Sequence, residues 1–516
     1  MKFKYIFLII LLTPFVLLGF TPTILSTNFG KNLFLKKTKI GTIEKLQVSW
    51  LKPQRIEGAD LKLPGGNTLE FTELTTTRGL LYELLSRSHF GGIKIVKPLI
   101  NWKISEETPT STGTNLPRPI AYWLLKKRAS LEISDGQINL RKKGSTITLS
   151  ELNLFFDKSH TDLFSLKLDS NCDILRAPRQ SRGKMSIELT SSLKTTGDYK
   201  ASFYFTEIPF DFFIPFIENK EWRHALIAKP IGETFSGKFI SEIKNRTGTA
   251  DLLFTASGFH ALLVSNLTNG ILTLDKEFQS EILLTPQLSD LLLTGINPLT
   301  ISDLKSEKPI SIRIDPNGFS LPLLPLDITK MHAPNVRINL GRVSCTNQGA
   351  FSKILTLFGG RTIGNNHEIK LWFAPMDLHI KSGAVNVERT EILINNRFDV
   401  ALWGDISFPK DRVDLTLGLT EDCLQQALGA KSDFPENYLL HLPIRGSLKT
   451  AQIDSGAATK KIAQLLAWDK KQMVTDLAKK IPGNSSFLDK LIGVFNDTPP
   501  DYRTKNPPAK NPLPWK

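Results

Sequence analysis

Apolar and polar residues alternate with a period of two along most of this chain. Residues 131–140 alternate on both sides of a Ser-Asp-Gly sequence, and residues 147–156 repeat the pattern. A second series covers residues 376–387, interrupted by Ser382 and Gly383, and further alternating runs follow it. Period two is typical of β-strands with one apolar and one solvated face, and short polar interruptions are typical of hairpin turns. The pattern therefore predicts a mainly β chain in which antiparallel hairpins follow one another as a meander.

Helical periodicity is confined to short stretches. The internal candidates are Gly79–Arg87, Ile120–Lys127, Phe213–Ile227, Phe351–Phe358 and Cys423–Leu428. Near the end of the chain, Lys460–Lys480 and Ser486–Val494 carry an apolar stripe that is typical of amphipathic helices. Residues 497–516 are rich in proline, and we predict that they are disordered.

The chain starts with a short basic segment and a long uncharged run. Lys2 and Lys4 precede residues 5–25, which contain no charged residue. About twenty such residues can cross a hydrocarbon core that is ~30 Å thick. A cleaved signal peptide needs small residues at its cleavage site, and the first alanine is Ala59. We interpret the run as an uncleaved transmembrane anchor, with a cleaved signal as the alternative, and the positive-inside rule predicts that the rest of the chain is exported.

The net charge of +15 is concentrated at the two ends of the chain. The first 43 residues hold six lysines and no acidic residue, and residues 459–516 hold eleven basic and five acidic residues. A nucleic-acid-binding domain concentrates positive charge on its folded body, whereas the body of this chain is nearly neutral. The pattern excludes a nucleic-acid partner and favours segments that lie near anionic lipid.

Sequence signatures of catalysis and metal binding are missing. The three cysteines, Cys172, Cys345 and Cys423, are far apart and predict buried thiols. The chain has no GxSxG, HExxH or GxxxxGK[ST] motif. Asp377 and His379 share one face of a strand, where they could ligate a metal or relay a proton, but the alternation assigns that face to solvent. We predict a chain without enzymatic activity, cofactor or metal; an exported enzyme is the weakest alternative.

A sheet with one apolar face has to cover that face. The internal helix candidates are too short to cover strands that are spread over about four hundred residues. Two solutions remain open: sheets that pack against each other as sandwiches, or a curved sheet with an apolar trough that a ligand fills. For an exported chain anchored in a membrane, lipid acyl chains are available to fill it.

Several segments occur in a recognisable order after the uncharged run. They are Ile40–Val48, Trp50–Pro53, Ile56–Leu63 and Gly92–Trp102. This order resembles the N-terminal part of the AsmA-like proteins, which include the TamB group. Residues 131–140 look like their recurring strand, Asp-Gly, strand element. Residues 442–453 look like their closing segment, with Ala451 where proline is usual.

The resemblance implies an elongated antiparallel β-sheet groove, built as a hairpin meander with a few short helices, one N-terminal transmembrane helix and C-terminal amphipathic helices. It also implies a bacterial inner-membrane protein, anchored through residues 5–25, with its bulk in the periplasm. Its apolar groove would passively shield the acyl chains of phospholipids, in phospholipid transport to the outer membrane or in outer-membrane homeostasis. The alternative is a non-enzymatic scaffold or assembly factor for outer-membrane proteins or other envelope components.

These expectations divide the chain and select candidate residues. The expected segments are an anchor (1–26), an N-terminal β region (27–195), a central β region with a short helix (196–330), a C-terminal β region (331–457), basic amphipathic helices (458–496) and the disordered tail (497–516). The lipid-facing candidates are Leu131, Ile133, Ile138, Leu140, Met376, Leu378, Ile380, Val385, Val387, Val400, Leu402, Val413, Leu415 and Leu417. The membrane-surface candidates are Lys460, Lys461, Lys470, Lys471, Lys479 and Lys480. Packing of this basic helix over the end of the sheet is the other interpretation.

Overall fold

The computed structural model describes residues 20–86, 89–103, 128–142, 145–158, 163–174, 182–192, 198–212, 217, 232–293, 304–323, 326–346, 368–431, 433–448, 450–479 and 498–513. In this part of the chain, 27 strands form a large mixed sheet that is mostly antiparallel, with few helices. The predicted mainly β meander is confirmed. No helix that the structure describes is long and apolar enough to span a membrane. Residues 1–19 of the predicted anchor lie outside the described residues.

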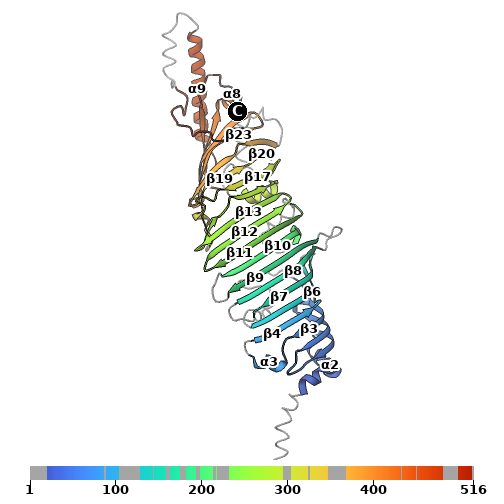
Figure 1. The fold of residues 1–516 in the computed structure, drawn as a ribbon. Helices are drawn as coiled ribbons and strands as arrows, with labels where there is room; N and C mark the ends of the chain where they lie inside the picture. The colour runs from blue at the N-terminus through green and yellow to red at the C-terminus, as the bar shows by residue number, and fades with distance from the viewer. Residues whose placement is uncertain are drawn as a thin grey trace, which may run out of the picture. The chain divides into compact units, whose positions relative to one another are not determined.

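Contacts divide the chain into two compact units. Unit 1 consists of residues 1–218 and 233–254, and unit 2 consists of residues 219–232 and 255–516. The elements of unit 1 are α2 (Asn28–Thr38), β1 (Gly41–Gln47), β2 (Arg55–Leu63), η1 (Pro64–Gly66), β3 (Asn67–Thr76), α3 (Leu80–Leu85), β4 (His89–Val96), β5 (Leu99–Lys103), β6 (Arg128–Lys142), β7 (Ser145–Asp157), β8 (Leu163–Ile174), β9 (Arg182–Ser192), β10 (Tyr199–Pro209), η2 (Phe210–Phe212), β11 (Thr234–Lys244) and most of β12 (Thr247–Ala256). The strands β6 to β11 follow one another side by side (Figure 1).

The predicted hairpin at residues 131–140 is a single strand. β6 is 15 residues long and runs parallel to both β4 and β5, which follow each other along its edge. The Ser-Asp-Gly sequence forms a bulge opposite the break between those two strands: the Lys97 amide donates to the Ser134 carbonyl and the Gln137 amide to the Pro98 carbonyl. Asp135 has a positive φ of 54°. Residues that usually favour a turn form a bulge here, because the partner of β6 changes from β4 to β5 at the same point.

Unit 2 contains the remaining elements. They are β13 (Phe259–Thr268), β14 (Ile271–Leu274), β15 (Phe278–Ile282), α6 (Pro286–Leu293), β16 (Lys305–Ser306), β17 (Ile310–Ile314), β18 (Leu321–Pro322), η4 (Ile328–Lys330), β19 (His332–Asn339), β20 (Gly341–Thr346), β21 (Glu368–Phe373), β22 (Met376–Lys381), β23 (Ala384–Ile394), β24 (Phe398–Ser407), β25 (Arg412–Thr420), α8 (Glu421–Leu428), β26 (Leu439–Gly446), β27 (Gln452–Ile453) and α9 (Ser455–Lys479). The hairpin predicted around Ser382 and Gly383 is confirmed, with Lys381 opposite Ala384. Both turn residues have positive φ, as a two-residue hairpin turn requires.

The helices that the structure describes agree in part with the periodicity. α3, α8 and most of α9 lie where the sequence predicts helices. The Thr420 hydroxyl caps α8 by accepting from the Cys423 amide, and Gly429 ends the helix in the left-handed region. The candidates Ile120–Lys127, Phe351–Phe358 and Ser486–Val494 lie outside the described residues, as does Phe213–Ile227 apart from Ile217.

The apolar face of unit 2 is closed by the unit's own elements. Its largest core contains the inward-facing residues of β20–β26 together with Leu424 of α8 and Leu465 and Trp468 of α9. The buried members include seven of the lipid-facing candidates: Val385, Val387, Val400, Leu402, Val413, Leu415 and Leu417. Their exposed fractions are between 0% and 8%. These positions contact protein and present no open apolar wall, in contrast to the expectation. α8 packs against β24 and β25, and α9 packs against β26.

The proline-rich tail also differs from the expectation of disorder. Residues 498–513 are described, and Leu513 is buried. The Asp501 carboxylate accepts hydrogen bonds from the Lys461 ammonium at 2.8 Å and from the His441 amide at 3.1 Å. The Tyr438 hydroxyl donates to the Pro500 carbonyl at 2.6 Å. Proline restricts the unfolded chain, so less conformational entropy is lost when such a segment docks in an extended form.

Candidate functional site

The described part of unit 1 contains an apolar face that crosses successive strands. Directly opposite residues of paired strands point to the same face, so the register places apolar side chains in rows. One row crosses β6 to β11 through Ile133, Leu154, Leu168, Ile187, Phe203 and Phe239. The neighbouring row contains Leu131, Phe156, Leu166, Leu189, Ala201 and Ser241. We call these two rows the unit 1 apolar face.

The side chains of this face are half-buried. Five of the six residues in the first row are half-buried, and Ile133 is buried. Among the described helices of unit 1, α2 packs against β1, α3 against β4 and the short η2 against β8. The surface of the two rows therefore stays partly accessible, unlike the closed core of unit 2. At about 4.8 Å between strands, the six-strand row is about 24 Å long.

Charged side chains mark the opposite face of the same strands. The Lys167 ammonium lies 2.8 Å from the Glu188 carboxylate, and the Lys200 ammonium lies 3.0 Å from the Glu242 carboxylate. All four side chains are more than half exposed. Unit 1 therefore has one ionic, solvated face and one apolar face, as period-two strands predict.

Aromatic rings extend the apolar face at its β10–β12 end. The ring centroids of Phe203 and Phe239 are 5.7 Å apart, and those of Phe235 and Phe254 are 5.1 Å apart. Phe210 lies 5.0 Å from Phe235 by the same measure. The predicted lipid-facing residues include none of residues 166–254. The sequence does carry a signal for these positions, because Leu166 alternates with Leu168 and Ile187 alternates with Leu189.

The lipid-facing candidates divide into three groups. Ile138 and Leu140 pair with Leu149 and Ile147 of β7, so they and the candidates Leu131 and Ile133 all belong to the apolar side of β6 in unit 1. In unit 2, Met376, Leu378 and Ile380 are half-buried and pack against the closed core. The other seven are inside that core. The structure therefore brings together only part of the predicted set in a place with open apolar surface.

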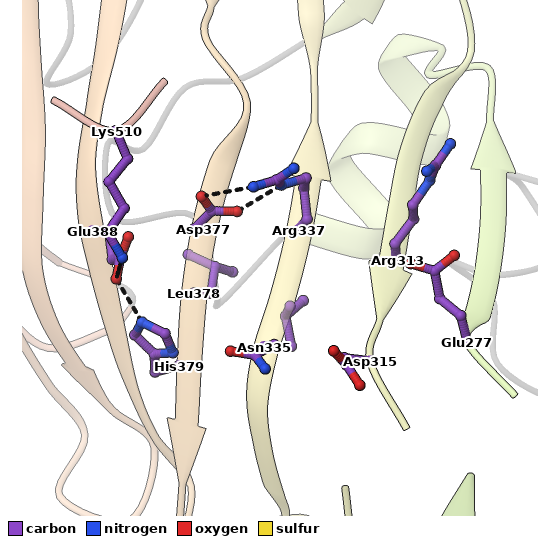
Figure 2. Close-up of a pocket in the computed structure, with 11 residues that line it drawn as sticks. Glu277, Arg313, Asp315, Asn335, Arg337, Asp377, Leu378, His379, Glu388 and Lys510 are labelled. Carbon is purple, nitrogen blue, oxygen red and sulfur yellow. Dashed lines mark hydrogen bonds and ion pairs between the residues drawn. The ribbon is translucent and has the colours of Figure 1, made fainter. Parts of the chain in front are cut away.

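A charged pocket of about 380 Å³ lies on the polar side of unit 2 (Figure 2). The Arg337 guanidinium donates to both oxygens of Asp377, at 2.7 and 3.2 Å. The Lys510 ammonium of the tail and the His379 Nε2 both contact Glu388 Oε1, at 2.5 and 2.6 Å. Asp377 and His379 thus lie on the polar side of their strand, as predicted.

Hydrogen bonds control the ionisation of this pocket. Burial alone would raise the pKa of Asp377 and of Glu388, but donors outweigh it and both pKa values lie below their ordinary range. For Asp377 the donors are Arg337 and Asn511, and for Glu388 they are Lys510 and His379. The Glu388 carboxylate and the Pro334 carbonyl raise the pKa of His379. Because Lys510 and Asn511 of the tail donate hydrogen bonds to Glu388 and Asp377, the arrangement is suited to holding the tail.

Only some of the membrane-surface candidates on the basic helix α9 are exposed. Lys460 and Lys470 are exposed, whereas Lys461 is paired with Asp501 and Lys471 is buried. The side chain of Lys479 and all of Lys480 lie outside the described residues. α9 packs against β26, so the predicted packing over the sheet is confirmed.

The cysteines match their prediction, since all three are buried and free. Burial raises the pKa of the Cys172 and Cys423 thiols to about 12, which keeps them protonated and unreactive. Within the described ranges, no group of three or more His, Cys, Asp or Glu side chains is arranged to hold a metal ion. Comparison with protein-family models, curated proteins and solved structures finds no match.

Proposed function

We propose that this protein binds lipid acyl chains on the unit 1 apolar face and acts, without catalysis, in phospholipid transport to the outer membrane of a bacterium or in the homeostasis of that membrane. The observation that carries the proposal is the half-buried row from Leu154 to Phe239, which continues into the buried Ile133. Its backbone polar groups are paired within the sheet, so an apolar ligand can cover the side chains without burying unpaired amides.

The dimensions of the face suit an acyl chain. One leaflet of a bilayer accounts for about 15 Å of hydrocarbon thickness, which is shorter than the row of about 24 Å. Contact with apolar side chains contributes roughly 25 cal/mol for each Å² of apolar surface removed from water. The resemblance to AsmA-like proteins and the uncharged run at residues 5–25 support a membrane-anchored, periplasmic location for this activity.

The closed core of unit 2 favours a different role for that unit. Its apolar residues already contact one another, α8 and α9. We propose that unit 2 is a scaffold that engages an outer-membrane or other envelope protein.

Photo-crosslinking in living cells tests the lipid proposal with a matched pair of positions. Phe203 lies on the unit 1 apolar face, and its neighbour Tyr204 lies on the opposite face of β10, where it is 42% exposed. In the full-length protein, p-benzoylphenylalanine at position 203 should form adducts with radiolabelled phospholipid, and the same group at position 204 should not. Equal labelling at both positions, or none at 203, would refute lipid binding on this face.

A charge substitution provides the energetic test. Ile187→Asp places a carboxylate in the row, whereas Ser186→Asp places it on the other face of the same strand. An acyl chain that desolvates the carboxylate costs at least about 1.4 kcal/mol, so we expect adduct formation at position 203 to fall roughly tenfold in Ile187→Asp only. An unchanged yield in Ile187→Asp would contradict the proposed contact.

A further inference from the structure

Three segments meet at the end of unit 1 where the described chain begins. Residues 20–26 are helical and α2 follows them, the loop at residues 49–54 lies between β1 and β2, and α3 follows β3. The Val48 amide donates to the Ser26 hydroxyl at 2.8 Å. The amides of Leu80 and Leu81 donate to the carbonyls of Ser49 and Trp50, at 3.0 Å each. In Figure 1, α2 and α3 lie at the same end of unit 1.

These segments expose large apolar side chains instead of burying them. Half of the exposed large hydrophobic residues in the described chain lie between residues 20 and 85. Leu51 is 80% exposed and Leu85 is 74% exposed. With Trp50, Leu81 and Tyr82 they line a shallow pocket of about 460 Å³. We call Leu51, Leu81, Tyr82 and Leu85 the N-terminal platform.

Exposed lysines occur in the same N-terminal segments as this apolar surface. Lys36, Lys37 and Lys39 at the end of α2 are exposed, as is Lys52 beside Leu51. Residues 20–43 contain no acidic residue. Exposed apolar side chains together with lysines are the pattern of a surface that lies in the interface of an anionic bilayer, where lysines attract the lipid head groups.

The position of residues 20–26 indicates that a lipid bilayer covers the platform. Residues 20–25 are the last part of the uncharged run, and Phe20 and Ile24 in that part are 60% and 46% exposed. Ser26 is hydrogen-bonded to Val48, and Trp50 is two residues further on, a span of at most ~7 Å. A bilayer that receives the uncharged run is therefore within reach of the platform.

We propose that the N-terminal platform is a membrane-seating surface that inserts into the interfacial region of an anionic lipid bilayer. Leu51 and Leu85 enter the acyl boundary, and Lys36, Lys37, Lys39 and Lys52 contact lipid phosphates. This contact holds unit 1 directly against the membrane, so that the chain is not tethered by the uncharged run alone. It is independent of whether an acyl chain occupies the unit 1 apolar face.

Environment-sensitive fluorescent labels on the full-length chain test whether the N-terminal platform inserts into the bilayer. Because the three native cysteines are buried, the variants Leu51→Cys and Leu85→Cys can each be labelled with the fluorophore NBD. Leu163→Cys on β8 is the matched control, since Leu163 is an exposed leucine of the same unit, outside the platform. The labelled proteins are reconstituted in vesicles of phosphatidylethanolamine and phosphatidylglycerol.

We expect a blue-shifted emission and a several-fold loss of intensity with acyl-brominated lipid at positions 51 and 85, and neither effect at 163. The blue shift should decrease when phosphatidylglycerol is replaced by phosphatidylcholine. Iodide is a quencher that stays in water. If it quenches the labels at positions 51 and 85 as strongly as the label at position 163, the proposal is wrong. Shielding in native membranes that is absent from pure lipid vesicles would also overturn the proposal, since it would identify a protein as the occupant.

Discussion

At the scale of single residues, His379 shows how the polar side of unit 2 is organised. Its Nε2 faces the Glu388 carboxylate and its Nδ1 faces the Pro334 carbonyl. Both partners are acceptors, so both ring nitrogens carry a proton when the two hydrogen bonds are made, which favours the imidazolium form. The pKa of His379 in the folded protein is accordingly raised above its unfolded value.

This raised pKa gives a pH dependence with a definite sign. The contribution of His379 to stability is fully present below its unfolded pKa of about 6.5 and is lost as the pH rises through the higher folded pKa. His379→Gln should therefore reduce stability more at pH 5.5 than at pH 8.5. The side chain is 42% exposed, and solvent screening limits the effect to less than about 1 kcal/mol.

Denaturation of both proteins at the two pH values measures this difference, and NMR follows the titration of the ring. Glu388→Gln removes the charge of the main partner and should return the titration of His379 toward 6.5. A ring that titrates below 6.5 in the unmodified protein would contradict the assignment. The sequence predicted the polar placement of Asp377 and His379 from alternation alone. It did not reveal Lys510, because Lys510 comes from a segment far along the chain. Glu388 is only nine residues from His379, at the end of the predicted hairpin, and could have been found from its register.

At the scale of elements, local sequence patterns predicted strands and helices but not how those elements pair or pack. The Ser-Asp-Gly sequence of β6 has the composition of a hairpin turn, yet the parallel edge formed by β4 and β5 makes it a bulge. The tail has the composition of a disordered segment, yet residues 498–513 make specific contacts with β22, β23, β26 and α9. Composition indicates the structure that a segment prefers in isolation. The bulge in β6 and the docked tail are both determined by contacts with other parts of the chain.

The Asp501–Lys461 pair should hold this tail in place. Asp501 is 13% exposed and Lys461 is 28% exposed, and the two side chains make hydrogen bonds with charged donors and acceptors. Asp501→Ala removes these contacts and leaves the ammonium without its carboxylate, at about 1.5–3 kcal/mol. We expect much faster amide hydrogen exchange across residues 498–513 and a lower unfolding temperature for unit 2.

Lys505→Ala is the matched control, because Lys505 is an exposed residue of the same tail. It should leave both measurements unchanged within about 0.5 kcal/mol. Equal exchange rates in Asp501→Ala and the unmodified protein would show that the tail is held by other contacts.

At the scale of the whole molecule, alternation predicted a mainly β meander but could not say what covers each apolar face. Period two shows that a strand has an apolar side, and the covering element can come from anywhere in the chain. In unit 2, α8 and α9 pack against the apolar core, and seven residues expected to face lipid are buried in it. In unit 1 the apolar face stays half-exposed over β6–β11. The two units therefore call for different physical roles, although their strands share one sequence pattern.

A pair of identical substitutions tests this difference. Leu415 is 1% exposed in the core of unit 2, whereas Leu168 is half-buried in the unit 1 apolar face. Truncation of a buried leucine costs about 2–5 kcal/mol, and an unpaired carboxylate costs more, against a typical total stability of 5–15 kcal/mol. We expect Leu415→Asp to unfold unit 2, as measured by hydrogen exchange in β24–β26. In Leu168→Asp the carboxylate can reach water, so the strands of unit 1 should stay protected while lipid adducts at position 203 disappear. Loss of protection in β7–β9 of Leu168→Asp would mean that unit 1 also has a dry core, and the acyl-binding face would have to be abandoned.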